Sequence, residues 1–410
     1  MTGLFSWWAA GDRTAHRAFV AAALGWMLDS FDVMLYALVL AWIMPALGIS
    51  RDVAGLLQSL TLVAAAGGGL LFGYIADAYG RTRALMGSVI IYSIFTAACG
   101  LAQNIPQLAL FRILLGIGMG GEWASGAALV SETWPAEHRG KVLGFMQSAW
   151  AIGYGAAAAV TAIVLPRWGW RAVFFVGVLP ALLTLWVRRG VPEPAMWHAA
   201  RASGTATGRG FGDLFDSGLA SLTAAVTIMN GFTLFAWWGF NLWVPGYLSL
   251  PVASGGIGLS AETMSAFVIA MQVGMWFGYV TFGFVSDAIG RKRTYVCYLV
   301  AAAILIAAYA SIRSPLGLLA LGPFVAFFGT GYFSGFGAVT AEIYPTAIRA
   351  RAQGFCYNVG RIASAAAPWT VGSLAQTHGF RVALLLSSVA LLCAAITWIW
   401  IPETRGRQLT

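Results

Sequence analysis

Two aspartates three residues apart interrupt one of the most apolar stretches of the chain. Asp29 and Asp32 lie in GWMLDSFDVMLYALVL, residues 25–40, where almost all of the remaining residues are apolar or aromatic. A spacing of three places two side chains on one face of a helix. A buried carboxylate gains a proton when it is desolvated and loses the proton when a cation approaches. This pair therefore has the chemistry of a reversible proton carrier.

Three more ionisable residues lie inside long apolar runs, namely Arg112, Glu122 and Arg361. One interpretation pairs Asp32 with Arg112 as a proton switch. If the distance between the two side chains changes with conformation, Asp32 binds a proton when Arg112 is distant and releases it when Arg112 is close. The alternative is a fixed ion pair that only orients two helices. Asp29 and Glu122 are expected to share the proton, contact a substrate or hydrogen-bond to a neighbouring helix.

The composition places these residues in a membrane. The chain is 59% hydrophobic and 10% charged, with a mean hydropathy of +0.77, whereas soluble domains are about 45–50% apolar and about 25% charged. A bilayer-crossing helix needs about 20 mainly apolar residues. Twelve runs meet this need: 18–44, 53–77, 84–103, 106–133, 140–165, 171–190, 218–249, 260–287, 294–312, 316–343, 350–376 and 381–400. Charges inside such runs are costly, so they are candidates for function.

The basic residues fix the expected orientation. With both termini cytoplasmic, the inner segments hold 17 of the 24 Lys and Arg residues, as the positive-inside rule requires. The same distribution accounts for the net charge of +9 without a nucleic-acid partner.

No other chemistry is indicated. The histidines lie at span ends or in loops, so a titrating group inside the membrane must be a carboxylate. The cysteines lie singly in apolar segments and suggest no disulfide or metal site. The glycine-rich GIGMGG (116–121) lacks the lysine and the preceding strand of a phosphate loop. We therefore expect no enzyme activity, no metal and no cofactor other than the proton as coupling ion.

An internal repeat defines the architecture. GYIADAYGRTR (73–83) recurs as GFVSDAIGRKR (283–293), and ETWPAEHRG (132–140) recurs as EIYPTAIRA (342–350), with residue numbers that differ by 210 in each pair. Two parallel repeats of six helices predict a substrate site at the midplane between the halves. The chain should thus be an all-α membrane protein of twelve transmembrane helices. Its expected parts are an N-terminal half over 1–190, a cytoplasmic linker over 191–217 and a C-terminal half over 218–410.

These motifs resemble the major facilitator superfamily along the whole chain. The repeated G-x-x-x-D-x-x-G-R-x-R is that superfamily's signature. The segment GGEWASGAALVSETWPAEHRG (120–140), together with LDSFD (28–32), is most similar to the sialate and monocarboxylate permeases, close to the sugar porters and the aromatic-acid permeases. The resemblance implies that Asp32 and Arg112 couple the proton. The seventh span lacks the polar cluster of fungal lactate permeases, which weakens a specific assignment to lactate.

Arg361 is the expected substrate ligand. Its counterpart 210 residues earlier is Ala151, so the arginine does not belong to the shared scaffold. A guanidinium binds a carboxylate through two parallel hydrogen bonds. Tyr357 and Asn358 precede it by about one turn on the same face. The alternative is a structural arginine neutralised by Glu122 or Asp29.

Two further helices carry polar residues at helical spacing. Asn230, Trp237 and Asn241 recur along the seventh span, and Gln147 and Tyr154 recur along the fifth. We expect both groups to face the substrate site. The aromatic residues around Trp237 could line a cavity, although such a stripe is more often plain packing.

The repeated loops carry charges of a different kind, which we expect to form a cytoplasmic gate. Carboxylates there can pair with arginines or cap a neighbouring helix. The expected gate residues are Asp77, Arg81, Arg83, Glu132, Arg139, Asp287, Arg291, Arg293, Glu342 and Arg349.

Together these features predict a secondary transporter that imports a small organic anion with protons by alternating access. The anion should bear a carboxylate, as do monocarboxylates, sialic acid and sugar acids. We expect a bacterial inner-membrane protein that functions as a monomer, with a small organic acid and the lipid bilayer as partners. The alternatives are a proton-coupled sugar or polyol porter and an exporter of hydrophobic compounds.

Overall fold

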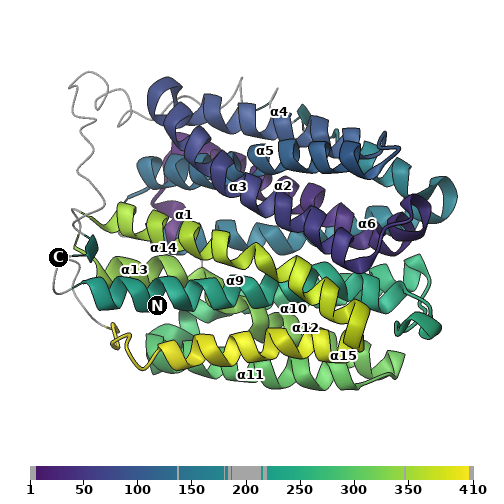
Figure 1. The fold of residues 1–410 in the computed structure, drawn as a ribbon. Coiled ribbons are helices and arrows are strands. Elements are labelled where there is room, and N and C mark those ends of the chain that lie inside the picture. Colours follow the sequence, from purple (N-terminus) through teal and green to yellow (C-terminus); the bar gives the residue numbers. More distant parts are fainter. Residues whose placement is uncertain are drawn as a thin grey trace.

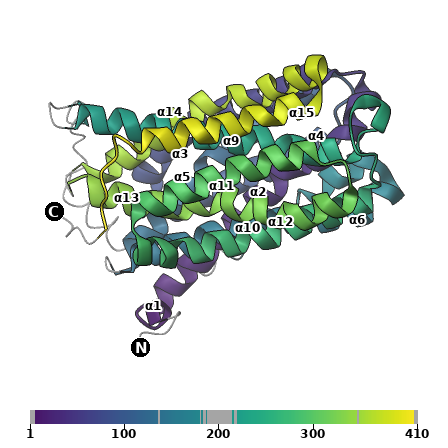
Figure 2. The same ribbon diagram turned by 90° about the horizontal axis from the view of Figure 1, so that it is seen from below.

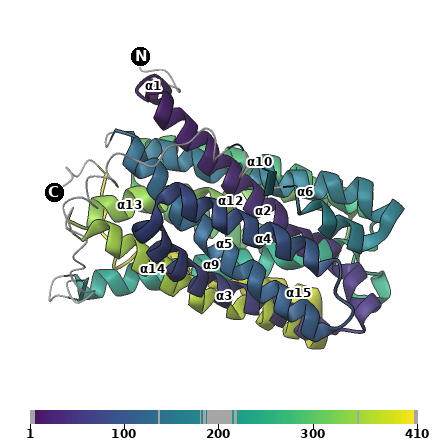
Figure 3. The same ribbon diagram turned by 90° about the horizontal axis from the view of Figure 1, so that it is seen from above.

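Long helices lie side by side in one bundle (Figure 1). The computed structural model describes residues 6–135, 138–179, 181–182, 186, 214–215, 219–345 and 348–405. The first helix and the segment that follows the last helix lie at the same end of the bundle, which we call the terminal end (Figures 2 and 3). The opposite end is the distal end. The expected linker over 191–217 lies almost wholly outside the described residues and stays a prediction.

The first half begins with a short helix that projects from the bundle (Figure 3). The helices of this half are α1 (Ser6–Ala9), α2 (Arg13–Leu47), α3 (Arg51–Tyr79), α4 (Arg81–Cys99), α5 (Ile105–Thr133) and α6 (Arg139–Val176). Side chains define several starts. Asp12 accepts from the backbone N–H of Ala15 at 2.7 Å, and Asn104 accepts from that of Gln107 at 3.0 Å. Such caps satisfy N–H groups that have no partner within the helix.

The second half repeats this order with one extra break. Its elements are α9 (Ala220–Ser249), η2 (Val252–Ser254), α10 (Ala261–Ile289), α11 (Arg291–Ser311), α12 (Pro315–Thr330), η3 (Gly331–Gly335), α13 (Phe336–Ile343), α14 (Arg349–Ser364) and α15 (Ala366–Thr397). The expected tenth span over 316–343 is not one helix, because the 3₁₀ turn η3 divides it. Its counterpart α5 is continuous.

Glycines with a positive φ mark the same three places in both halves. The pairs are Gly48 and Gly258 (63° and 79°), Gly80 and Gly290 (117° and 104°), and Gly169 and Gly379 (75° and 80°). Only glycine adopts this backbone region without strain. Because the members of each pair are 210 residues apart, the repeat extends from the motifs to the backbone conformation.

The last of these pairs lies where one expected span ends and the next begins. The backbone is non-helical at Gly169 inside α6 and at Gly379 inside α15, so each helix contains the end of one expected span and the start of the next. Nine stretches of the described residues are long and apolar enough to cross a membrane. Two of these stretches, Lys141–Val176 and Ala352–Thr397, run through the kinks. Each of these two stretches therefore covers two expected spans. The nine stretches and α5 together account for the twelve expected spans, although the sixth span is described only in part.

The two halves meet chiefly along three pairs of helices. α6 packs against α10, α15 against α3, and α9 against α2. In Figure 1 the first half forms the upper layer and the second half forms the lower layer. A large apolar core includes residues from both halves. The structure is therefore a pair of six-helix repeats with a buried interface between them.

Candidate transport site between the two halves

Three buried carboxylates gather inside the first half. Asp29, Asp32 and Glu122 are each at most 1% exposed. The Glu122 carboxylate lies directly against Gly25 of α2. Tyr92 of α4 lies close enough to all three carboxylates for their charges to act on it. The two aspartates and the glutamate that the sequence singled out are thus neighbours in the fold.

These carboxylates have few hydrogen-bond partners. Neither oxygen of Asp32 or Glu122, and only one oxygen of Asp29, has a partner or contact with solvent among the described residues. Thr96 lies beside Asp32, but its hydroxyl donates to the Tyr92 carbonyl at 2.8 Å. Burying an unpaired carboxylate costs several kcal/mol. The first half alone therefore offers little to stabilise three ionised carboxylates side by side.

Arg112 does not pair with Asp32 in this conformation. Its guanidinium donates to the Gln58 side chain and lies 4.0 Å from the centre of the Tyr36 ring. Cys99 lies near both residues, because the charges of Arg112 and Asp32 both act on its thiol. The fixed ion pair considered from the sequence is therefore not present here, and the role of the two residues as a switch stays a prediction.

Arg361 faces the carboxylates from the other half. It lies on α14, is 3% exposed, and has no hydrogen bond or ion pair from its guanidinium within the described part of the chain. The guanidinium carbon is 5.2 Å from the centre of the Tyr357 ring. Its charge acts on Asp29 of α2. A buried cation from one half thus lies near a buried carboxylate of the other.

The other expected substrate residues divide into two groups. Asn230 donates to the Cys356 carbonyl at 3.1 Å and so attaches α9 to α14. The Asn358 side chain donates within its own helix, to Gly354. Tyr154 and Gln147, in contrast, reach across the interface. The Tyr154 hydroxyl donates to the Asn241 carbonyl at 3.2 Å, and Gln147 lies beside Tyr279 of α10.

Aromatic side chains fill the interface beside these residues. The Trp150 ring centre of α6 lies 4.6 Å from that of Trp26 on α2 and 5.5 Å from that of Trp237 on α9. Trp238 lies 4.7 Å from Trp237. The sequence pattern allowed packing or a cavity wall for the seventh span. It did not reveal that the cluster includes both halves.

Five of the expected gate residues form three ion pairs at the terminal end, and each of these pairs lies within one half. Arg81 pairs with Glu132 at 2.8 Å, and Arg291 pairs with Glu342 at 3.0 Å and with Asp287. The Arg81–Glu132 pair joins the start of α4 to the end of α5. The Arg291–Glu342 pair joins the start of α11 to the end of α13. The side chains of Asp77 and Arg139 lie outside the described residues.

The remaining gate residues have other positions. Arg83 and Arg349 donate to the backbone carbonyls of Tyr79 and Tyr344, and Arg293 is exposed.

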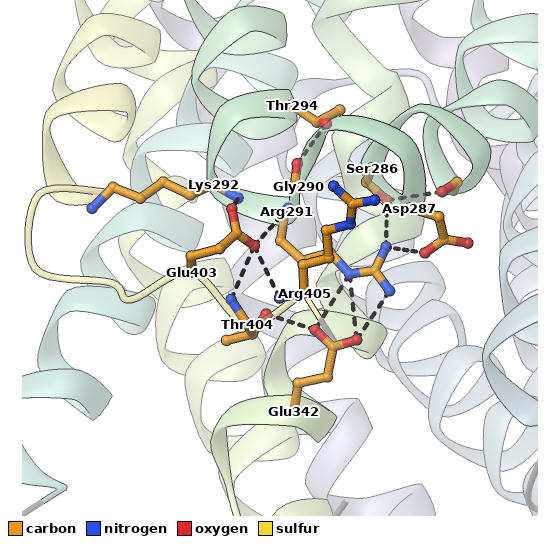
Figure 4. A network of polar contacts seen from close by, with 11 residues as sticks. Ser286, Asp287, Gly290, Arg291, Lys292, Thr294, Glu342, Glu403, Thr404 and Arg405 are labelled. Carbon is orange, nitrogen blue, oxygen red and sulfur yellow. Dashed lines mark hydrogen bonds and ion pairs between the residues drawn. The ribbon is translucent and has the colours of Figure 1, made fainter. Parts of the chain in front are cut away.

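A contact that the sequence did not predict extends the network in the second half (Figure 4). Glu403, which follows α15, accepts from the backbone N–H groups of Arg291 and Lys292 at 2.8 and 3.1 Å. The Thr404 hydroxyl donates to Glu342 at 2.6 Å. The signal in the sequence is the PET motif (402–404), which repeats PEP (192–194) 210 residues later. The PET segment therefore caps α11.

Arg51 was also missed, and it joins the two halves at the distal end. Its guanidinium donates to the carbonyls of Ala375, at 2.6 Å, and Ser254. It also lies 4.8 Å from the centre of the Phe380 ring. All three partners belong to the second half, whereas Arg51 begins α3 of the first. In the sequence it resembled an ordinary charge at a span end.

Comparisons with known proteins agree with this architecture. The family model of the Major Facilitator Superfamily matches residues 22–251 and 247–410. The chain is 31% identical to the cis,cis-muconate transport protein of Acinetobacter baylyi, over 96% of each chain. It is 30% identical to the sialic acid transporter NanX of Escherichia coli, over 94% of this chain and 93% of that one.

Among solved structures, the D-xylose-proton symporter matches with a TM-score of 0.78 at 22% identity, over 97% of this chain and 100% of that chain. This similarity concerns the fold, whereas the family match and the two relatives concern the protein as a whole. The repeat, the buried ionisable residues and the family match lead to one conclusion: the chain is an integral membrane transporter that belongs to the major facilitator superfamily.

Proposed function

We propose that this transporter is a proton-coupled symporter that imports a small organic anion through the anion's carboxylate. Two similar proteins are named for cis,cis-muconate and sialic acid, and both compounds carry carboxylates. The transporter would work as a monomer in a bacterial inner membrane with both termini cytoplasmic. The basic residues at the terminal end, among them Arg81, Arg291 and Lys292, support this orientation.

The observation that carries the proposal is the buried, unpaired guanidinium of Arg361. A buried charge is strongly destabilising unless a partner compensates it. The charges of Asp29 and Arg361 interact, but the two side chains form no ion pair in the described part of the chain. An anionic substrate would supply the missing partner, and the planar fork of arginine suits a carboxylate.

The same geometry suggests how proton and substrate are coupled. When Arg361 is unoccupied, its charge stabilises an ionised Asp29. When a substrate carboxylate neutralises Arg361, that stabilisation is lost and Asp29 takes up a proton. Anion and proton would then bind together and leave together. Asp32 lies further along α2 beside Thr96, where it would receive the proton and meet Arg112 in another conformation.

The test of substrate binding uses two variants of Arg361. Arg361→Lys keeps the charge but loses the planar fork, so it should bind the acid more weakly. Arg361→Ala should lose about thirty-fold or more in affinity, because truncating one partner of a buried charge pair costs about 2–5 kcal/mol. Isothermal titration of purified protein with muconate and sialic acid measures both. Near wild-type affinity in a monodisperse Arg361→Ala protein would contradict the proposal.

The test of coupling uses the two aspartates in proteoliposomes. Asp29→Asn and Asp32→Asn should each abolish accumulation driven by a pH gradient, while exchange of substrate across the membrane continues at least in part. Full accumulation in both variants would exclude these carboxylates as proton carriers. Uptake of a neutral sugar that organic acids do not inhibit would favour the sugar-porter alternative instead.

A further inference from the structure

A cluster of four tryptophans lies where the two halves meet. Trp26 comes from α2 and Trp150 from α6, whereas Trp237 and Trp238 come from α9 of the other half. All four are at most 6% exposed. Trp150 is at the centre, and its ring contacts the other three edge-on or tilted, with ring centres 4.6 to 6.5 Å apart. The cluster therefore bridges the interface that must rearrange during transport.

The repeat places this cluster at the depth of the charged residues. Trp150 corresponds to Gly360, the residue before Arg361, and Trp237 corresponds to Met27, the residue after Trp26. The Ser30 hydroxyl, one residue after Asp29, donates to the Trp150 carbonyl at 2.7 Å. Aromatic faces, the cation and the carboxylates thus share one level of the bundle.

Two of the indole N–H groups are buried without an acceptor. Those of Trp150 and Trp237 have no hydrogen-bond partner among the residues that the structure describes. Trp243, two turns further along α9 and fully buried, behaves differently because its N–H donates to the Pro368 carbonyl at 3.0 Å. A buried donor without a partner loses its hydrogen bonds to water and gains none in return. A bound molecule with an acceptor atom would restore them.

We propose that Trp150 and Trp237 determine specificity and select planar, conjugated carboxylic acids. This inference rests on the proposed transport of an organic anion and narrows its substrate class. The acid's carboxylate would bind Arg361, its flat unsaturated part would stack on the indoles, and a second polar atom would accept from an indole N–H. Aromatic rings prefer offset or edge-on contacts with other planar π systems, which a saturated chain cannot make.

The origin of the two tryptophans adds a reason for this assignment. Trp150 belongs to the first half and Trp237 to the second, so the binding wall is complete only when the halves approach each other. A planar acid between them would stabilise that approach. A flexible saturated acid would contribute less, because its chain must lose more conformational freedom to fit.

The experiment compares two six-carbon dicarboxylates, planar cis,cis-muconate and saturated adipate. Wild-type protein should bind muconate at least about tenfold more tightly than adipate, as stacking and one hydrogen bond allow. Trp150→Leu and Trp237→Leu should reduce this preference to within about threefold. Trp150→Phe and Trp237→Phe keep a ring but lose the N–H, so they should weaken muconate binding less than the leucine variants do.

Trp243→Phe is the matched control, since it also removes a buried indole N–H, but one that is satisfied within its own half. It should keep the wild-type preference for muconate. A wild-type protein that binds both acids equally, or a Trp243→Phe variant that loses as much preference as Trp150→Phe, would overturn the specificity role and leave acid transport intact. Absence of binding by either acid, and by sialic acid, would instead overturn the proposed function and this inference with it.

Discussion

The two ends of the helix bundle are held together in different ways. At the distal end, polar contacts cross between the halves, with Arg51 of α3 donating to the Ser254 and Ala375 carbonyls. At the terminal end, the Arg81–Glu132, Arg291–Glu342 and Arg291–Asp287 pairs each lie within one half. Rocking of the halves requires one end to close as the other opens. The contacts of Arg51 must therefore break during transport, whereas these three ion pairs can persist.

The distal end should be most sensitive to side chains added between α3 and α15. A Cβ on Gly55 would lie 2.8 Å from the Pro368 carbonyl carbon, which is closer than real Cβ contacts. Gly55→Leu should thus prevent distal closure, since overpacking costs about 1–3 kcal/mol or more and shifts the equilibrium about ten- to a hundredfold. Transport should be nearly lost.

Labelling of an introduced cysteine measures this opening. Ser59, 8% exposed, accepts from the Trp369 backbone N–H across the same interface. In a background with Cys297→Ser and Cys393→Ser, Ser59→Cys should react with maleimide much faster when Gly55→Leu is present. Gly67→Leu on the same helix is the control, because its Cβ would meet no atom within 4 Å. Equal reactivity in the two variants would contradict the predicted clash.

The next largest effect is expected from Arg51→Gln. It removes charged hydrogen bonds between the halves, each worth about 1.5–3 kcal/mol, so the Ser59→Cys probe should react about tenfold faster or more. Arg313→Gln is the matched control, because Arg313 donates to the Gly255 carbonyl in the same loop, at 3.0 Å, from within the second half. If Arg313→Gln accelerates labelling as much as Arg51→Gln, the role of Arg51 as a tie between halves is wrong.

The contrast between the ends also shows what the sequence could reveal. The repeat predicted the two halves and charged gate residues at equivalent positions in both. Arg81–Glu132 and Arg291–Glu342 are ion pairs between such residues, although the sequence did not indicate which residues pair. The buried Asp29, Asp32 and Glu122 were identified because charges in apolar runs are rare. The sequence therefore predicts features that recur in both repeats and charged residues that stand in apolar segments.

The sequence did not predict features that depend on a single contact between distant segments. Arg51 has Ala261 as its counterpart, and its acceptors are backbone carbonyls, which no side-chain pattern encodes. The tryptophan cluster combines residues more than a hundred positions apart, such as Trp26 and Trp150. The kinks at Gly169 and Gly379, in contrast, lie where the sequence predicted one span to end and the next to begin.

A smaller effect, and a different kind of effect, is expected at the terminal end. Glu342→Gln removes the charge that pairs with Arg291, where both side chains are 13% exposed, so stability should fall by about 1–2 kcal/mol. Asp287→Asn should cost less, because the Asp287 side chain is 62% exposed and solvent screens its pair with Arg291. The melting temperature in detergent measures both changes.

Labelling of Ser59→Cys separates this effect from that of the distal variants. It should stay at the wild-type rate in both terminal-end variants, because their pairs lie within one half. A rate raised as much as in Arg51→Gln would remove the distinction between the two ends.

The smallest effect concerns Glu403, which stabilises the terminal end through backbone contacts. Partial burial alone would raise the pKa of its carboxyl, but the N–H groups of Arg405, Arg291, Lys292 and Thr404 outweigh this and hold the pKa below its ordinary value of 4.5. The ionised form is therefore favoured in the folded state. Its contribution is complete above the ordinary pKa and is lost as the pH falls through the lowered one.

Glu403→Gln should accordingly lower the stability by less than about 1 kcal/mol at neutral pH, since the carboxylate is exposed and screened. The gap in melting temperature between wild type and variant should stay constant from pH 8 to pH 6 and close as the pH falls below about 4.5, where an unfolded glutamate gains its proton. Labelling at Ser59→Cys should not change, because Glu403 caps a helix of its own half. A gap that widened on acidification would mean that the protonated carboxyl is the stabilising form, and Glu403 would then not act as an anionic cap of α11.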